Sequence, residues 1–140
     1  MLILLLGLLW IAPSQSAVVD MPGTWVAEHR GTRFVRLELK AVKDTLAGAI
    51  GTGNVNVDDN GDLKEVTAVP MTLTPLYDVI VKGPSITFMR PEGGDDEHFR
   101  FTVLGVDQAE LTLILSEELL EELKDEGIPV PKPFRLHKIR

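Results

Sequence analysis

The sequence predicts an all-β fold: a small antiparallel up-and-down β-barrel of about eight or nine strands, with one short helix before the last strand. Apolar residues recur at every second position in a series of short segments. Gly, Asn, Asp and Pro separate these segments at short intervals. Because closure of such a meander removes exposed strand edges, a barrel is favoured, and a two-sheet sandwich is the alternative.

The first 16 residues are expected to be a secretory signal peptide. Residues 1–12 form an uncharged, almost wholly apolar run, which is shorter than the roughly 20 residues that span a bilayer. Ser14 and Ser16 stand two positions apart, as a signal peptidase site requires. Residues 17–140 would then form one domain, secreted or periplasmic, with no stable membrane span. An uncleaved anchor or a misassigned start codon is the alternative, because no Lys or Arg precedes the apolar run.

The composition excludes several classes of function. The chain has 140 residues and no cysteine, so disulfides, thiolate nucleophiles and cysteine zinc sites are ruled out. Its 14 Lys and Arg against 21 Asp and Glu give a net charge of −7. Affinity for nucleic acid comes from clustered Lys and Arg, so a nucleic-acid partner is not expected.

The strands follow from alternation along the chain. In segment 33–40 the apolar residues at odd positions share one face and the charged residues at even positions share the other. The same pattern places strands at 23–28, 33–40, 45–50, 63–69, 77–82, 86–89, 98–103, 111–116 and 134–139. Turns are expected at 57–61, 82–84 and 91–95, where Gly and Asn supply positive φ angles.

One segment, 117–126, has helical spacing instead. Ser116 can cap its N-terminus, acidic residues occupy its first turn, and Gly127 can end it. The outer face of this short amphipathic helix is acidic. The Pro-rich segment 128–133 cannot continue a helix and is expected to be an extended connector into the last strand.

Four short motifs resemble those of small secreted bacterial barrel domains of the lipocalin-like or avidin-like (calycin) type. They are Gly23-Thr24-Trp25, Leu46-Ala47-Gly48 and the segments 81–88 and 133–136. The resemblance covers nearly all of residues 17–140 and implies a fold and a secreted location more than a reaction. It also implies that an indole at the closed end of the barrel packs against a cation from the last strand. The residues so implied are Trp25 for the indole and Arg135, Lys138 or Arg140 for the cation.

Catalytic groups are not evident in the sequence. His29, His98 and His137 are scattered, and no two have metal-ligand spacing within one element. None of the four serines stands in a Gly-x-Ser-x-Gly motif. The paired carboxylates fall in turns or on the helix surface, where nothing apolar would raise their pKa values for acid chemistry. We therefore expect a protein that is not an enzyme and needs no cofactor.

The one weak metal candidate is the loop with oxygen-bearing side chains at alternate positions, Asn56, Asp58, Asn60 and Asp62. It resembles a calcium loop, but the first position is Asn, the twelfth is Thr67 rather than Glu, and no helices flank it. A hairpin turn explains the same residues.

All side chains predicted to point into the barrel are apolar, so a cavity there would suit a small hydrophobic molecule. The pocket candidates are Trp25, Val35, Leu37, Leu39, Ile86, Phe88, Phe99, Phe101, Leu113 and Phe134. Three hypotheses follow. The first is a barrel that binds a small apolar ligand. The second is a filled-core domain that binds a protein of the cell envelope through the helix and connector. The third and least favoured is a barrel enzyme.

Overall fold

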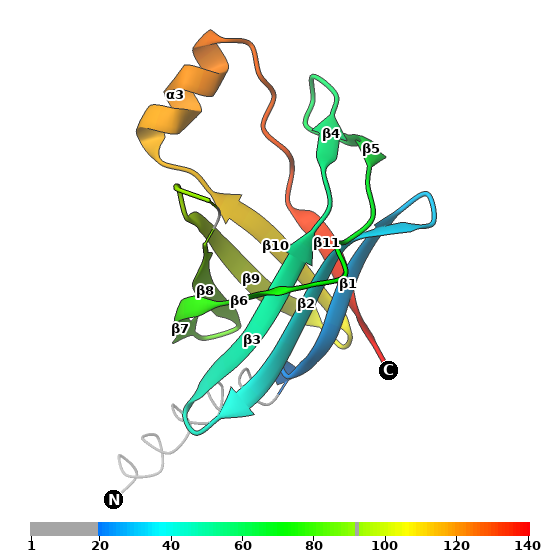
Figure 1. Ribbon diagram of the computed structural model, residues 1–140, viewed down its shortest axis with the longest axis vertical. Helices are drawn as coiled ribbons and strands as arrows, with labels where there is room; N and C mark the ends of the chain where they lie inside the picture. The colour runs from blue at the N-terminus through cyan, green and yellow to red at the C-terminus, as the bar shows by residue number, and fades with distance from the viewer. Residues whose placement is uncertain (1–19, 92) are drawn as a thin grey trace, which may run out of the picture.

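The computed structural model describes residues 20–91 and 93–140, and the expected signal peptide, residues 1–16, lies outside them. Figure 1 shows the arrangement of the elements. In chain order they are β1 (Gly23–His29), β2 (Thr32–Val42), β3 (Thr45–Thr52), β4 (Val55–Val57), β5 (Leu63–Val66), β6 (Thr74–Pro75), β7 (Tyr77–Lys82), β8 (Ser85–Arg90), β9 (Glu97–Gly105), β10 (Gln108–Ile114), α3 (Glu117–Asp125) and β11 (Phe134–Ile139).

The predicted antiparallel barrel with a helix before its last strand is confirmed. One nine-stranded sheet has the order β6-β3-β2-β1-β11-β10-β9-β8-β7. Apart from the β1–β11 pair and the β3–β6 pair, neighbours in this sheet follow one another along the chain, as in an up-and-down meander. The first strand pairs with the last, with Trp25 opposite Lys138.

A single bent segment, residues 74–82, nearly closes the sheet, because it pairs with both edges. Its first part, β6, pairs with β3, and the backbone N–H of Leu76 donates to the carbonyl of Gly48 at 2.9 Å. Its second part, β7, pairs with β8. The register shifts between Tyr77 and Ile80, where Asp78 has a φ of 51°. Asp tolerates this left-handed conformation better than most residues, so the segment can bend from one edge to the other.

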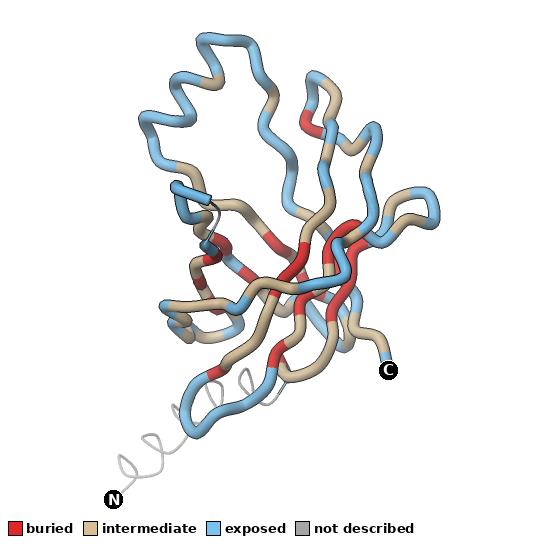
Figure 2. Tube along the Cα trace, in the orientation of Figure 1, coloured by how far each residue is buried: buried red, intermediate tan, exposed pale blue. Residues whose placement is uncertain are grey.

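The alternating apolar residues meet inside the barrel. Figure 2 shows the buried positions following the barrel strands, whereas α3 and its connector are mainly exposed. The packed core consists of Met21, Trp25, Ala27, Phe34, Val35, Leu37, Leu39, Leu46, Ile50, Ile86, Phe88, Phe99, Phe101, Ala109, Leu111 and Leu136. Burial of this much apolar surface is the main favourable contribution to folding.

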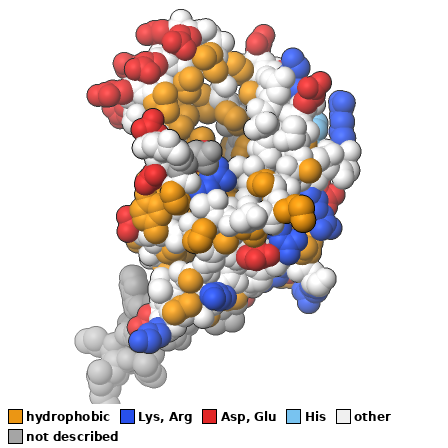
Figure 3. Space-filling view, in the orientation of Figure 1, with side chains coloured by type: hydrophobic (Ala, Val, Ile, Leu, Met, Phe, Trp, Pro, Cys, Tyr) orange, Lys and Arg blue, Asp and Glu red, His pale blue; other side chains and the backbone are white. Residues whose placement is uncertain are grey.

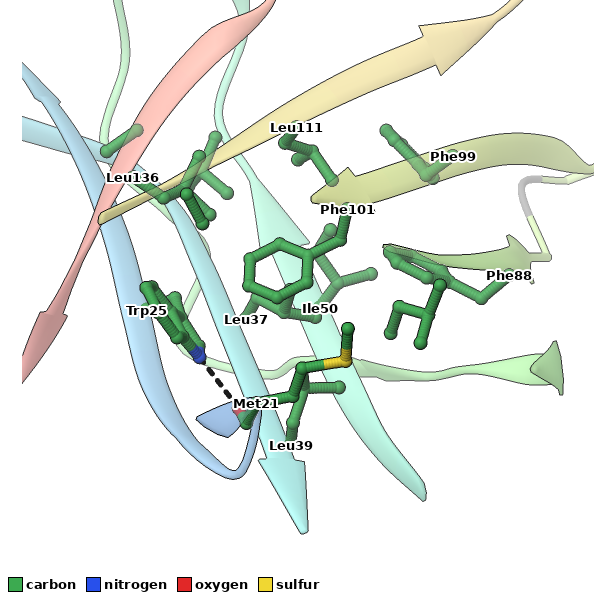
Figure 4. Close-up of a cluster of buried hydrophobic side chains, with 14 of the residues drawn as sticks. Met21, Trp25, Leu37, Leu39, Ile50, Phe88, Phe99, Phe101, Leu111 and Leu136 are labelled. Carbon is green, nitrogen blue, oxygen red and sulfur yellow. Dashed lines mark hydrogen bonds between the residues drawn. The ribbon is translucent and has the colours of Figure 1, made fainter. Parts of the chain in front are cut away.

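Trp25 lies at the closed end of the barrel, where the chain enters β1. Its indole N–H donates to the carbonyl of Met21 at 2.8 Å, and its ring meets Phe101 edge-on with centroids 5.1 Å apart (Figure 4). The ammonium of Lys138 lies 4.9 Å from the indole centroid and also donates to the carbonyl of Asp20. Met21 is itself fully buried, so these side chains fill this end of the barrel.

Of the three cations considered for this end, only Lys138 is placed over the indole within the described part of the chain. The Nε atom of Arg135 lies 3.9 Å from a carboxylate oxygen of Glu110, and Arg140 is paired with Asp107 at 2.9 Å. The cross-strand register explains the difference, because Lys138 is directly opposite Trp25. Such a cation over an indole face is an electrostatically favourable contact.

The segment expected to be a barrel strand at 63–69 is placed differently. Its first part is β5, which pairs with β4 in a separate two-stranded hairpin outside the main sheet. The following residues then cross the outer face of the barrel, where Val69 donates its N–H to the carbonyl of Arg33. Val26 and Val69 both border the groove beneath this crossing segment, and Val26 is fully buried although it faces outward.

Two excursions extend from the end of the barrel opposite Trp25: the β4–β5 hairpin and α3 with its connector (Figure 1). The connector, residues 128–133, runs back into β11 without regular secondary structure. Within the described residues, no helix has both the length and the apolar character needed to cross a membrane.

Gly48 provides a test of the tight contact between β2 and β3. A Cβ atom at this position would lie 1.9 Å from the carbonyl oxygen of Glu38. We predict that Gly48→Ala lowers the free energy of unfolding by about 1–3 kcal/mol, because the backbone must shift to relieve the clash. Gly105→Ala is the matched control, since a Cβ there meets nothing within 4 Å. Equal urea midpoints for the two variants would contradict the tight contact between β2 and β3.

Lys138 provides a test of the closed end. Lys138→Met keeps the apolar stem but removes the charge above Trp25, so we predict a loss of about 1 kcal/mol in the free energy of unfolding. Lys82→Met, at an exposed position at the end of β7, is the control and should change stability by less than about 0.5 kcal/mol. Urea unfolding followed by tryptophan fluorescence measures both. A loss no greater than that of the control would contradict the cation–π contact.

Candidate functional site

The candidate site is a cavity of about 420 Å³ at the open end of the barrel, opposite Trp25. The space-filling view shows a hollow beneath α3 that is bordered by hydrophobic side chains (Figure 3). Its lining residues are Ile50, Gly51, Thr52, Gly53, Asn54, Val55, Pro70, Thr72, Thr74, Arg90, Glu97, Phe99, Leu111, Leu113, Leu115, Val130, Pro131, Lys132 and Phe134. The volume lies within the range of about 300–1,000 Å³ typical of small-molecule sites.

An ion pair between the buried Arg90 and the partly buried Glu97 belongs to the polar part of the cavity wall. Arg90 is only 7% exposed, and its Nε donates to Glu97 Oε1 at 2.8 Å. The Nη2 of Arg90 donates to the same oxygen, and its Nη1 donates to Thr52 Oγ1 at 2.9 Å. The guanidinium also lies 5.2 Å from the ring centroid of Phe99. A charge can be buried here because it is paired and hydrogen-bonded.

This ion pair corrects the expectation that the barrel interior is wholly apolar. Arg90 follows Ile86 and Phe88 at two-residue intervals and therefore shares their inward face. Glu97 precedes Phe99 by the same interval, and the β8–β9 register places Glu97 directly opposite Arg90. The alternation in both strands contains this signal, because it places Arg90 and Glu97 at inward positions.

The structure divides the ten predicted pocket residues into two groups. Phe99, Leu113 and Phe134 line the cavity at the open end. The other seven, which do not line it, are buried in the packed core: Trp25, Val35, Leu37, Leu39, Ile86, Phe88 and Phe101. The division has a steric reason, because the large rings and Met21 fill the lower part of the barrel (Figure 4). Space therefore remains only towards the open end.

One wall of the cavity is lined by the connector, through Val130, Pro131 and Lys132, and the connector is tied to the β4–β5 turn. The backbone N–H of Lys132 donates to the carbonyl of Gly61 at 3.0 Å, and its ammonium bonds Asp62 Oδ1 at 2.8 Å. The hydrogen bond and the negative charge of Asp62 raise the pKa of Lys132 above its ordinary value. Lys132 is therefore fully charged at neutral pH and ties the connector to the hairpin.

Helix α3 stands above this wall with well-formed ends. The hydroxyl oxygen of Ser116 accepts a hydrogen bond from the N–H of Leu119 at 3.2 Å, as an N-cap does. At the other end, Ile128 donates to Leu123 and Gly127 donates to Lys124, which is a Schellman motif. The helix predicted at 117–126 is thus observed as α3, because its capping residues at both ends are local sequence signals. None of its residues is buried.

The loop considered as a metal site forms a turn. Asp58 Oδ1 accepts from the backbone N–H groups of Asn60 and Asp62, and Asp62 binds Lys132. Asn56 lies in β4 before the turn. Among residues 20–91 and 93–140, no group of three or more His, Asp or Glu residues is arranged to hold a metal ion.

The three histidines do not line the cavity in the described structure. His29 Nε2 lies 3.3 Å from the carbonyl oxygen of Lys64. His137 is opposite Val26 on the neighbouring strand, and its Nε2 is 3.9 Å from a carboxylate oxygen of Glu28. The polar and charged lining residues are Thr52, Asn54, Thr72, Thr74, Arg90, Glu97 and Lys132. They place no imidazole beside a nucleophile.

Comparison with known proteins returns no matching family model, no matching curated protein and no matching solved structure. The function must therefore be argued from the cavity and its lining.

The ion pair gives a prediction about stability. Glu97→Gln removes the carboxylate that receives two hydrogen bonds from Arg90, so we predict that it lowers the free energy of unfolding by about 1–3 kcal/mol. The matched control is Glu38→Gln, which breaks the exposed Arg36–Glu38 pair, with side chains 40% and 46% exposed, and should cost less than about 1 kcal/mol. Equal losses in urea unfolding would show that burial adds nothing to the Arg90–Glu97 pair.

Proposed function

We propose that this domain is a non-enzymatic binding protein that takes a small, mostly apolar molecule into the open end of its barrel. The observation that carries the proposal is the cavity of about 420 Å³, which remains where the packed core ends. A barrel of about eight strands is just wide enough to hold one small ligand when its side chains do not fill it.

The composition of the lining supports binding of an apolar body. Much of the hydrophobic part of the lining comes from three neighbouring strands, β9, β10 and β11, and from the residue that follows β10 by one position. These residues are Phe99, Leu111, Leu113, Leu115 and Phe134. A ligand that covers this surface removes it from water, which is favourable in proportion to the apolar area buried. A few polar groups within an apolar lining are the usual pattern of a small-molecule site.

The polar groups of the wall favour binding over catalysis. Arg90 and Glu97 neutralise each other, and the hydroxyl oxygen of Thr52 accepts a hydrogen bond from Arg90. A general base would need to stand within hydrogen-bond reach of a nucleophile or of the substrate proton. An ion pair in which both charges are already satisfied serves better to orient a ligand.

The lipocalin-like or avidin-like resemblance and a secreted or periplasmic location are part of the same proposal. Both rest on the sequence: the short motifs around Trp25, and the apolar residues 1–12 with Ser14 and Ser16. An extracytoplasmic binding protein would meet its ligand outside the cytoplasmic membrane, so the ligand would not have to cross that membrane.

A second candidate function is the docking of an envelope protein on α3 and its connector. The observation that favours it is a set of exposed apolar side chains there: Leu119 at 39%, Leu120 at 41%, Ile128 at 47% and Val130 at 39%. Contiguous exposed apolar surface is typical of interaction sites. This reading requires no ligand in the barrel, so the two candidates predict different results with a small apolar probe.

The binding proposal is tested with N-phenyl-1-naphthylamine, an uncharged apolar dye whose fluorescence rises in a hydrophobic site. We predict saturable binding at one dye per chain. Leu113→Trp fills part of the cavity and should weaken binding at least about tenfold, a loss of about 1.4 kcal/mol. Thr112→Trp is the matched control, because it adds the same bulk on the adjacent, outward position of β10 and is absent from the cavity lining. Its dye affinity should stay within about twofold of the unmodified chain.

Dye binding that does not saturate, or that Leu113→Trp leaves unchanged while the variant remains folded, would contradict the proposal. Native mass spectrometry of protein purified from its own host gives an independent readout. A reproducible extra mass that disappears on denaturation and organic extraction identifies the chemical class of the natural ligand. Identical native and denatured masses, together with no saturable dye site, would favour the docking function of α3.

A further inference from the structure

The polar wall of the cavity presents one acceptor and one donor side by side. The hydrogen bonds from Arg90 Nε and Nη2 to Glu97 both end on Oε1, so they leave the second carboxylate oxygen, Oε2, as an acceptor. Thr52 Oγ1 accepts from Arg90 Nη1 at 2.9 Å. Its own hydroxyl hydrogen must then point away from the guanidinium, and it is a donor. Thr52, Arg90 and Glu97 all line the same cavity.

Glu97 is paired with Arg90, and Lys132, which also lines the cavity, is paired with Asp62. This charge balance disfavours a charged ligand group. A ligand carboxylate would compete with Glu97 for Arg90 and would place two carboxylates beside each other. A ligand ammonium would compete with Arg90 for Glu97 and would lie next to a guanidinium. In either case an additional charge enters a site where charges are costly unless each is paired.

From this arrangement, and resting on the proposed function, we infer that the ligand is an uncharged amphiphile whose polar group both donates and accepts a hydrogen bond, as an alcohol or a primary amide does. Its polar group donates to Glu97 Oε2 and accepts from Thr52. Its apolar body lies along Phe99, Leu113 and Phe134, which line the same cavity.

The surroundings of the cavity mouth agree with this class. The first turn of α3 carries Glu117 and Glu118, and the β8–β9 turn carries the exposed Asp95 and Asp96. Figure 3 shows acidic side chains gathered on the outer side of the helix above the hollow. A negative rim lowers the local concentration of anions, which disfavours fatty acids as ligands relative to neutral amphiphiles of the same chain length.

The experiment is competition against N-phenyl-1-naphthylamine at pH 7 by four compounds that each carry a ten-carbon chain: 1-decanol, decanamide, decanoate and decyl methyl ether. The ether accepts a hydrogen bond but cannot donate one, so it isolates the role of the Glu97 acceptor. We expect decanol and decanamide to displace the dye at concentrations at least about tenfold below those of decanoate and the ether.

Two variants test whether the polar residues of the cavity wall cause the preference for decanol and decanamide. Glu97→Gln removes the negative charge beside Arg90, so the ratio of decanoate to decanol affinity should rise at least about tenfold. Thr52→Val removes the hydroxyl donor at nearly constant volume, so decanol and the ether should both weaken by about threefold to tenfold. The affinity of each folded variant for the dye reports the integrity of the cavity.

The outcomes separate this inference from the proposed function. Equal displacement by all four compounds, or strongest displacement by decanoate, overturns the inference about the ligand's polar group. If the dye still binds saturably, the proposed function is retained. A preference for decanol that neither variant alters also overturns the inference, because the wall would not be its source. Absence of saturable dye binding overturns both.

Discussion

The structure depends on the way residues 74–82 pair with both edges of the sheet. A meander of this length would otherwise leave two exposed edges, which are sites of unwanted pairing. The bend at Asp78 lets β6 bind β3 and β7 bind β8. Once these edges are brought together and β1 pairs with β11, the inward side chains of all the strands share one interior.

The contents of that interior differ along the barrel axis, and this difference creates the site. At the closed end, Trp25, Met21 and Phe101 occupy the space, and Lys138 covers the indole from the last strand. At the open end, Arg90 and Glu97 stand where further large apolar side chains would complete the core. A charge away from water is costly unless it is paired and hydrogen-bonded. The Arg90–Glu97 pair meets this condition at the edge of the cavity.

The two excursions beyond the barrel complete the cavity without belonging to the sheet. The connector after α3 is tied to the β4–β5 turn through Lys132, Gly61 and Asp62. A segment about 70 residues away in the chain therefore holds the connector in place beside the cavity. Helix α3 is held by its own caps more than by burial. Its exposed leucines belong to the surface proposed above for a protein partner.

The sequence by itself determined most of the secondary structure and the fold class. Alternation in segments such as 33–40, the turn residues and the caps at Ser116 and Gly127 are local signals, and local hydrogen bonding and burial decide them. Only the tertiary structure decided which of the apolar residues fill the barrel and which border a cavity, because this depends on how side chains from different strands share one volume.

The polar residues of the candidate site also depend on contacts between strands that a local sequence pattern does not contain. The alternation placed Arg90 and Glu97 on the inward face, but their pairing with each other and with Thr52 depends on the β8–β9 register and on the position of β3. The choice of Lys138 over Arg135 and Arg140 likewise depended on the register between β1 and β11. Register is set by contacts between segments distant in the chain, so a pattern within one segment cannot specify it.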